Sequence, residues 1–168
     1  MFMVPLPANP HRLDPYKSFK FQLILDGDVV AGVSRIGDLR RRTEVVLHRD
    51  GRMPSHPLTA PGATSFDPIV LERGITQDTT FRDWAELAYS PQGGGAMSLK
   101  NFRKDLRIDL LNQQGSVVLS YMVFRAWVSE FEALPELDAN GNEVAIERIV
   151  LQHEGWEQDR AVAEPVET

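Results

Sequence analysis

The chain has 168 residues, a length that favours a single domain. Its 18 lysines and arginines against 24 acidic residues give a net charge of −6, which argues against a non-specific nucleic-acid binder and against a protein of anionic membrane surfaces. The absence of cysteine excludes disulfides, thiolate metal sites and cysteine nucleophiles, so an apolar core has to hold the fold.

Residues 1–15 are predicted to form an extended arm. Pro5, Pro7, Pro10 and Pro15 each lack a backbone N–H and bias the preceding residue away from helical geometry. The composition leaves two interpretations open, a disordered tail or an arm that docks on a neighbouring subunit. The same prolines interrupt the apolar start, so no secretory signal is expected, and no apolar run approaches the roughly 20 residues of a membrane helix.

The middle of the chain is predicted to consist of β-strands separated by turns. Apolar and polar residues alternate with a period of two, and Asp-Gly, Gln-Gly and Asn-Gly pairs separate the segments. The predicted strands cover residues 18–25, 29–33, 43–49, 66–73, 104–111, 117–131 and 143–153. Residues 117–131 are apolar on both faces, which predicts a central strand or one bent by a bulge near Ala126 and Trp127.

One segment has the spacing of a helix. Thr79 or Thr80 could cap it, and the apolar residues that follow, Phe81 and Trp84 among them, fall on one face before the chain reaches Pro91. The fold class predicted from these elements is mainly β, an antiparallel sandwich or barrel with one short flanking α-helix.

Two segments are predicted to be loops. Residues 51–64 contain three prolines and carry no charge from Met53 onward, which indicates a long loop of the kind that is usually functional or disordered. The three glycines at 93–95 follow a helix and precede a strand. Phosphate-binding loops have the reverse order, so a flexible loop is expected there.

The densest basic site is the run of Arg40, Arg41 and Arg42. It could protect an exposed strand edge against aggregation, pair with an acidic patch on another copy of the chain, or contact a separate ligand. The residues alone leave all three open.

No catalytic, cofactor-binding or metal site is predicted, and the chain is not expected to be an enzyme. The four histidines lack the spacing of a zinc site, and the serine at Gly32-Val33-Ser34 lacks the second glycine of a nucleophile elbow. Glu130 and Glu132 face the same side of an extended segment, where solvated carboxylates are expected rather than a converging catalytic pair.

Five short segments follow one another with a distinctive order and spacing. They are residues 14–27 (DPYKSFKFQLILDG), 30–39 (VAGVSRIGDL), 69–76 (IVLERGIT), 107–115 (RIDLLNQQG) and 137–155 (LDANGNEVAIERIVLQHEG), with Trp84 and Ala126-Trp127 between them. Over about residues 14–156 this pattern resembles the tube proteins of contractile phage tails and of phage-tail-like extracellular injection systems, a fold similar to haemolysin-coregulated-protein tubes.

The resemblance implies a structural role. Members of the family form six-membered rings that stack around a lumen, and a surrounding sheath drives the tube into a target to deliver cargo or DNA. The expected organisation is an arm at residues 1–15, a tube domain at 16–156 and an acidic, flexible tail at 157–168. Arg40, Arg41 and Arg42 against Glu130 and Glu132 are the expected contact between subunits. The residues expected to stack the rings are Met53, Pro54, His56, Pro57, Leu58 and Pro61.

The implied partners are copies of the same chain, sheath, baseplate and tube-terminator proteins, and cargo in the lumen, with no membrane insertion by this chain alone and no cofactor. Assembly is expected in the cytoplasm, before the tube becomes part of a virion or of an extracellular or cytoplasmic particle. Two alternatives remain, a tube-initiator paralogue at the baseplate and, in a different class, a β-sandwich ligand-binding module.

Overall fold

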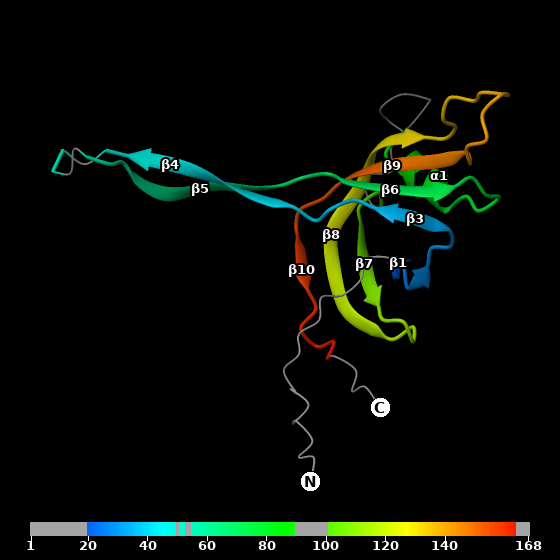
Figure 1. The fold of residues 1–168 in the computed structure, drawn as a ribbon, viewed down its shortest axis with the longest axis horizontal. Coiled ribbons are helices and arrows are strands. Elements are labelled where there is room, and N and C mark those ends of the chain that lie inside the picture. The colour runs from blue at the N-terminus through cyan, green and yellow to red at the C-terminus, as the bar shows by residue number, and fades with distance from the viewer. Residues whose placement is uncertain (1–19, 50, 53–54, 90–100, 164–168) are drawn as a thin grey trace, which may run out of the picture.

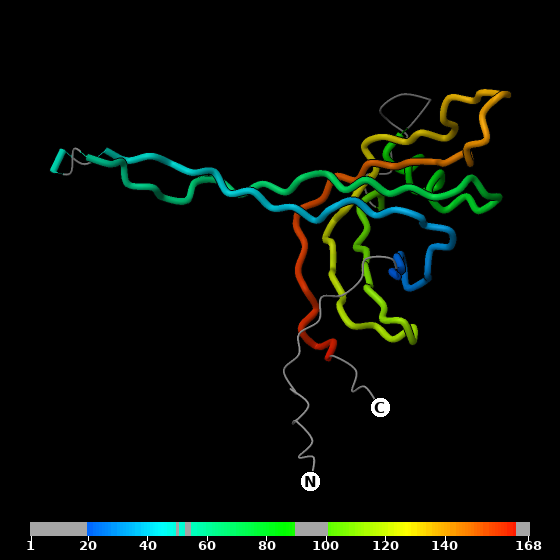
Figure 2. Tube along the Cα trace, in the orientation of Figure 1, coloured from blue at the N-terminus to red at the C-terminus, as the bar shows by residue number. Residues whose placement is uncertain are grey.

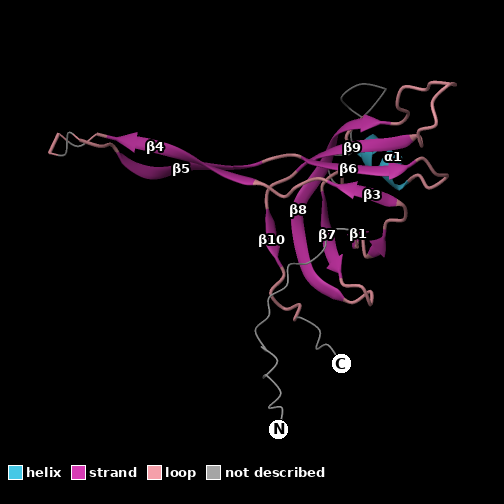
Figure 3. Ribbon diagram, viewed as in Figure 1, coloured by secondary structure: helices cyan, strands magenta, loops and turns pink. Residues whose placement is uncertain are grey.

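The computed structural model describes residues 20–49, 51–52, 55–89 and 101–163. The predicted arm, the glycines at 93–95 and the predicted stacking residues Met53 and Pro54 lie outside these ranges. The strands are β1 Phe21–Leu25, β2 Asp28–Val29, β3 Val33–Ile36, β4 Arg41–His48, β5 Leu58–Phe66, β6 Ile69–Gly74, β7 Lys104–Leu111, β8 Val117–Glu132, β9 Ile146–Gln152 and β10 Trp156–Gln158, and the helix is α1 Thr80–Leu87 (Figures 1 and 3). The predicted antiparallel β fold with one short helix is confirmed.

Eight strands form one bent antiparallel sheet. Seven lie in the order β2-β1-β7-β8-β9-β6-β3, and β10 pairs with β8. The segment predicted as one strand at 29–33 is divided between β2 and β3, because Gly32 takes a positive φ of 77° that breaks the extended backbone. At the other end, β10 carries sheet pairing to Gln158, two residues into the segment predicted as a tail.

β8 is the long central strand that its two apolar faces predicted. Its first part pairs with β7 and its last part with β9, so it belongs to both halves of the sheet. The bend lies at Arg125, which has a φ of 51°, next to the predicted position at Ala126. Positive φ is uncommon for a residue with a side chain. Here the Arg125 N–H donates to Oδ1 of Asp105 at 2.8 Å, so the bend leaves this donor satisfied.

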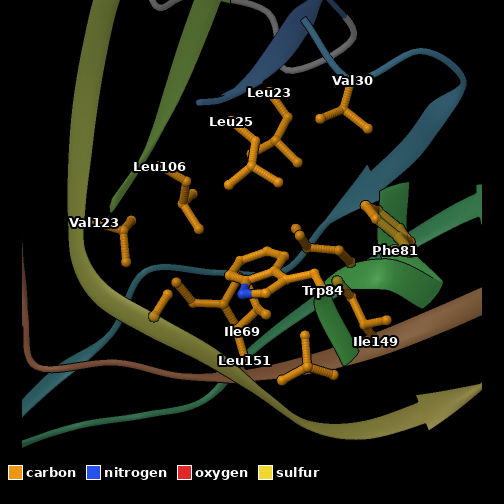
Figure 4. Packing of buried hydrophobic residues seen from close by; sticks show 13 residues of the cluster. Leu23, Leu25, Val30, Ile69, Phe81, Trp84, Leu106, Val123, Ile149 and Leu151 are labelled. Atoms are coloured by element: carbon orange, nitrogen blue, oxygen red, sulfur yellow. The ribbon is translucent and has the colours of Figure 1, made fainter. Parts of the chain in front are cut away.

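The core lies between the two halves of the sheet and the helix (Figure 4). Leu23 and Leu25 from β1 face Ile149 and Leu151 from β9, and Trp84 from α1 lies among them with 1% of its surface exposed. The indole Nε1–H of Trp84 donates to the carbonyl of Phe102 at 3.0 Å, which removes the cost of burying that donor. The helix therefore closes the core with its predicted apolar face.

The helix begins next to the two predicted threonines, but Asp78 supplies the side-chain cap at its N-terminus. Thr79 occupies the N-cap position without bonding the backbone, and its hydroxyl donates to Asp83 at 2.9 Å. The N–H of Thr80 donates instead to Oδ1 of Asp78 at 2.8 Å. Hydrogen bonds from Thr80 and the positive charge of Arg73 lower the pKa of Asp78 below its usual 3.8.

A buried ion pair ties the end of β6 to β9. Arg73 is fully buried, and its Nε–H donates to Oε1 of Glu147, which faces it across the two strands. The Arg73 guanidinium lies 4.4 Å from the ring centroid of Phe81, and its Nη2 donates to the carbonyl of Asp78 at 2.7 Å. One side chain thus connects the sheet, the turn before the helix and the helix itself.

Glu147→Ala is expected to lower the free energy of unfolding by about 3–5 kcal/mol, because it leaves a buried guanidinium without its carboxylate. Urea unfolding followed by tryptophan fluorescence measures this loss. The matched double variant Arg73→Met/Glu147→Leu removes both charges and should regain most of the stability. A Glu147→Ala protein within about 1 kcal/mol of the parent would contradict the assignment.

Candidate assembly surface

A two-stranded hairpin stands apart from the main sheet. β4 and β5 pair with each other from Arg41 opposite Phe66 to His48 opposite Leu58, and they form their own sheet (Figures 1 and 2). The segment 51–64, predicted as a loop, is therefore a strand from Leu58 onward, and the loop prediction is wrong there. Prolines did not prevent pairing, because each strand of a two-stranded ribbon has an unpaired edge on which a missing N–H costs nothing. Pro61 lies opposite Val45, beside an irregularity in the register.

The hairpin exposes apolar side chains on both faces. Val45 and Leu47 lie two residues apart and so share one face, and they are 65% and 63% exposed. Leu58 pairs with His48 on the opposite face and is 46% exposed. We call Val45, Leu47 and Leu58 the hairpin surface. An isolated two-stranded hairpin is marginal in water, and exposed apolar strands invite pairing with other chains. The hairpin surface therefore has the character of a contact with another molecule.

The base of the hairpin is fixed to the main sheet. The ring of Phe66, at the end of β5, lies 5.8 Å from that of His153, whose Nε2 is 2.8 Å from the carbonyl oxygen of Asp67. Gly155 has a φ of 136°, and a side chain there would meet the Phe66 ring at 3.2 Å. The glycine thus allows the close approach that holds the hairpin at its root.

The three predicted arginines lie at this root, each with a partner in its own chain. Nη2 of Arg40 lies 2.8 Å from Oδ2 of Asp38, and Nη2 of Arg42 lies 3.0 Å from Oδ2 of Asp67. The Arg41 guanidinium lies 6.0 Å from the ring centroid of Trp156. The Arg40 and Arg42 side chains are still more than half exposed, so a second acceptor can reach them.

Glu130 and Glu132 lie elsewhere, near the exposed end of β8. Glu132 is opposite Arg148 in the register with β9. Among the residues that the structure describes, neither glutamate pairs with the three arginines within one chain. The predicted contact between subunits joins regions that are separate in the protomer, and it stays a prediction.

The structure also shows exposed apolar side chains that none of the sequence predictions singled out. Leu134, Leu137 and Val144 in the connection between β8 and β9 are 61%, 69% and 76% exposed, and Ile75, which follows β6, is 40% exposed. The Ile75 N–H donates to the carbonyl of Ala145 at 3.1 Å, which places the two segments together. We call Ile75, Leu134, Leu137 and Val144 the body-end surface. Its signal in the sequence was the alternation of acidic and apolar residues around Leu134 and Leu137.

The described residues were also compared with the requirements of a metal site and of a membrane-spanning helix. Within the described ranges, no group of three or more His, Asp or Glu side chains is placed to hold a metal ion. His56 bonds its neighbour Ser55 near the hairpin tip, and His153 holds the hairpin root. No helix in the described part of the chain is both long and apolar enough to cross a bilayer.

Comparison with known proteins identifies a family whose sequence model matches this chain. The family model described as T4-like virus tail tube protein gp19 matches residues 17–157. No curated protein sequence matches the chain.

Solved structures share the fold. A chain of the PVC sheath–tube complex, an extracellular contractile injection system in its extended state, is 20% identical, with 86% of this chain and 91% of that chain covered and a TM-score of 0.71. A chain of the tube-terminating cap of the anti-feeding prophage is 23% identical, with 87% and 91% covered and a TM-score of 0.72. A chain of the anti-feeding prophage baseplate is 21% identical, with 86% and 95% covered and a TM-score of 0.69.

Proposed function

Because this chain belongs to the T4-like virus gp19 tail tube family, we propose that it is a structural subunit of the inner tube of a contractile particle. Its working unit is a ring of six copies, and the rings stack around a lumen that carries cargo or DNA. The observation that carries the proposal is the hairpin of β4 and β5, which projects from the body with apolar side chains exposed on both faces. A protomer that works alone has no use for such an element, whereas a stacked ring buries it.

The same proposal extends to partners and location. The structures that share the fold are named as a sheath–tube complex, a tube-terminating cap and a baseplate. We propose that this chain likewise contacts a sheath, a baseplate and a terminator, assembles in the cytoplasm and then forms part of an injection particle or virion.

The proposed role is mechanical and needs no catalysis. It needs a stiff wall, which continuous sheet pairing supplies. The competing idea of a ligand-binding module needs several aromatic side chains open to a cleft, but two of the three tryptophans pack within the chain. Trp84 is buried, and the centroid of the Trp127 ring lies 6.1 Å from that of Phe102. Trp156 packs against Tyr121, with 6.0 Å between the ring centroids, and also lines an open pocket with Arg41 and Phe124.

The hairpin is the proposed stacking element. Of the residues predicted for this role, His56 and Pro57 lie between the strands near the tip, while Leu58 and Pro61 lie in β5. We propose that this hairpin, together with the arginines at its root, contacts neighbouring protomers.

Purified protein is expected to form six-membered rings and stacked tubes in negative-stain microscopy, with ring masses in mass photometry. The exposed hairpin side chains become buried only on assembly, so high protein concentration favours stacked rings. A protein that stays monomeric at high concentration and never forms rings would contradict the proposed function.

Val45→Ser/Leu47→Ser is expected to leave the unfolding free energy of the protomer within about 0.5 kcal/mol, because both side chains are exposed. The same variant should shorten the tubes, because stacking loses its apolar contact. Tube length in micrographs and urea unfolding give the two readouts. Val29→Ser is the matched control, since Val29 is 58% exposed in β2, away from the hairpin. Tubes of unchanged length in the double variant would show that the hairpin does not form the stacking contact.

A further inference from the structure

The half of the sheet built from β1, β7, β8 and β10 has one face that points away from the core. Leu106 and Val123 belong to the core, so alternation along β7 and β8 turns Asp109 and Ser120 to the opposite face, which we call the outer face. Asp109 and Ser120 are nevertheless 0% and 1% exposed, and Oγ of Ser120 donates to Oδ1 of Asp109 at 2.7 Å. Val118, which shares their face, is also buried although it lies outside the core cluster.

Burial on the outer face needs a covering segment. The described helix that packs across this half of the sheet is α1, and its Trp84 lies on the core face (Figure 4). A sheet face that is open to solvent exposes its carboxylates and hydroxyls. The burial of Asp109 and Ser120 therefore indicates that a further part of the chain covers them.

The N-terminal segment is the best candidate for this cover. Residues 1–19 precede β1 and carry a net charge of +1, with Arg12 and Lys17 against Asp14. Residues 164–168 are five in number and include two glutamates, which would repel the buried carboxylate of Asp109. Residues 90–100 join α1 to the opposite end of β7.

An open pocket lies at the β10 side of the outer face. Its volume is about 690 Å³, and Met122, Phe124 and Trp156 supply its apolar and aromatic lining. The indole Nε1–H of Trp156 is buried and has no acceptor among the described residues. A buried donor without an acceptor is costly, so a carbonyl brought to this ring is stabilising.

The rim of the pocket carries both signs of charge. Arg41 and Arg160 line it together with Glu157 and Asp159. This mixture selects neither a small anion nor a small cation. Aromatic grooves are instead suited to proline-rich segments, whose rings pack on the aromatic side chains and whose backbone carbonyls make no hydrogen bonds within the segment.

The N-terminal segment contains such a sequence. Residues 7–10 (PANP) have the proline spacing P-x-x-P, and the polyproline II helix repeats every three residues, so both prolines fall on one face. Arg12 follows two residues later and complements the carboxylates of Glu157 and Asp159 at the rim. The segment therefore matches the pocket in apolar surface, acceptors and charge.

The sheet places the start of this segment near the pocket. The carbonyl of Lys20 accepts from the Leu111 N–H at 2.9 Å, and the carbonyl of Ser120 accepts from the Asp159 N–H at 2.8 Å. Since β1, β7, β8 and β10 are successive neighbours, three strand spacings, about 14 Å, separate Lys20 from Asp159. The ten residues from Pro10 to Lys20 can span about 33 Å. The segment is long enough to cross the outer face of its own protomer.

We infer that residues 7–12 dock in the pocket beside β10 of the same protomer, with the two prolines on Trp156 and Phe124, and that residues 13–19 cross the outer face to reach it. Docking covers Asp109 and Ser120 and brings backbone carbonyls to the Trp156 ring. The inference goes beyond the proposed tube function and does not depend on it, because the contact forms within one chain.

Cysteine cross-linking tests the contact directly, because the chain has no cysteine of its own. Ala8→Cys is combined with Gln158→Cys, an exposed position that lines the pocket, and the purified full-length protein is oxidised. The expected result is a disulfide within one chain, seen as loss of both free thiols without any joining of chains on a non-reducing gel. Mass spectrometry of a digest identifies the peptide that links positions 8 and 158.

Ala8→Cys/Val29→Cys is the matched control. Val29 is 58% exposed and pairs with Ile24, four residues along β1 from Lys20, so it lies about 14 Å from the start of the segment, as the pocket does. An undocked segment would reach both positions alike, whereas a docked one links to position 158 several-fold faster. Circular dichroism verifies that both variants fold.

The outcomes separate the inference from the proposed function. Equal thiol loss in the two variants, or free thiols in both, overturns the inference. Disulfides that join two chains place the segment on a neighbouring protomer and also overturn it. Each of these results leaves the tube function standing, since microscopy of the parent protein tests rings and tubes separately.

Removal of the two prolines is a second test. Pro7→Ala/Pro10→Ala, added to the variant with cysteines at 8 and 158, should slow disulfide formation several-fold, because the segment loses its preformed extended conformation and its ring contacts. Pro5→Ala/Pro15→Ala removes the same number of prolines outside the P-x-x-P pair and should leave the rate unchanged. Equal slowing by both double substitutions would overturn the assignment of this pair to the pocket.

Discussion

The architecture depends on the continuity of one strand. β8 runs for 16 residues, pairs with β7 over its first part and with β9 over its last, and thereby makes one sheet of two differently oriented halves. The bend at Arg125 turns the two halves toward each other, so that Leu106 and Val123 on one side and Ile69 and Leu151 on the other meet around Trp84 (Figure 4). Without this bend the core would lose one of its walls.

The hairpin of β4 and β5 stays outside this sheet, but its root is held against it. Phe66 and Gly155 fix its root against the link between β9 and β10, and Arg41 reaches the Trp156 ring from the same root. Beyond this root, the described part of the structure gives β4 and β5 no strand partner other than each other. A sheet domain with one protruding hairpin suits a subunit whose neighbours cover the exposed side chains of that hairpin.

The predictable features were local ones. β7 and α1 appear close to their expected positions because alternation and helical spacing are properties of consecutive residues. β5 was missed because prolines and an uncharged run are typical of loops, and only the presence of β4 alongside decides that such a segment pairs. The buried pair of Arg73 and Glu147 was missed for a related reason, since 74 positions separate its members in the chain.

The sequence by itself determined the family, the antiparallel β class and the absence of disulfides, because these follow from ordered motifs, periodicity and composition. Only the tertiary structure decided which apolar residues are covered. Leu23 and Leu25 follow the same alternation as Val45 and Leu47, yet the first two are buried and the last two are largely exposed. Alternation specifies that two side chains share a face, and burial depends on whether another part of the molecule, or another molecule, packs against that face.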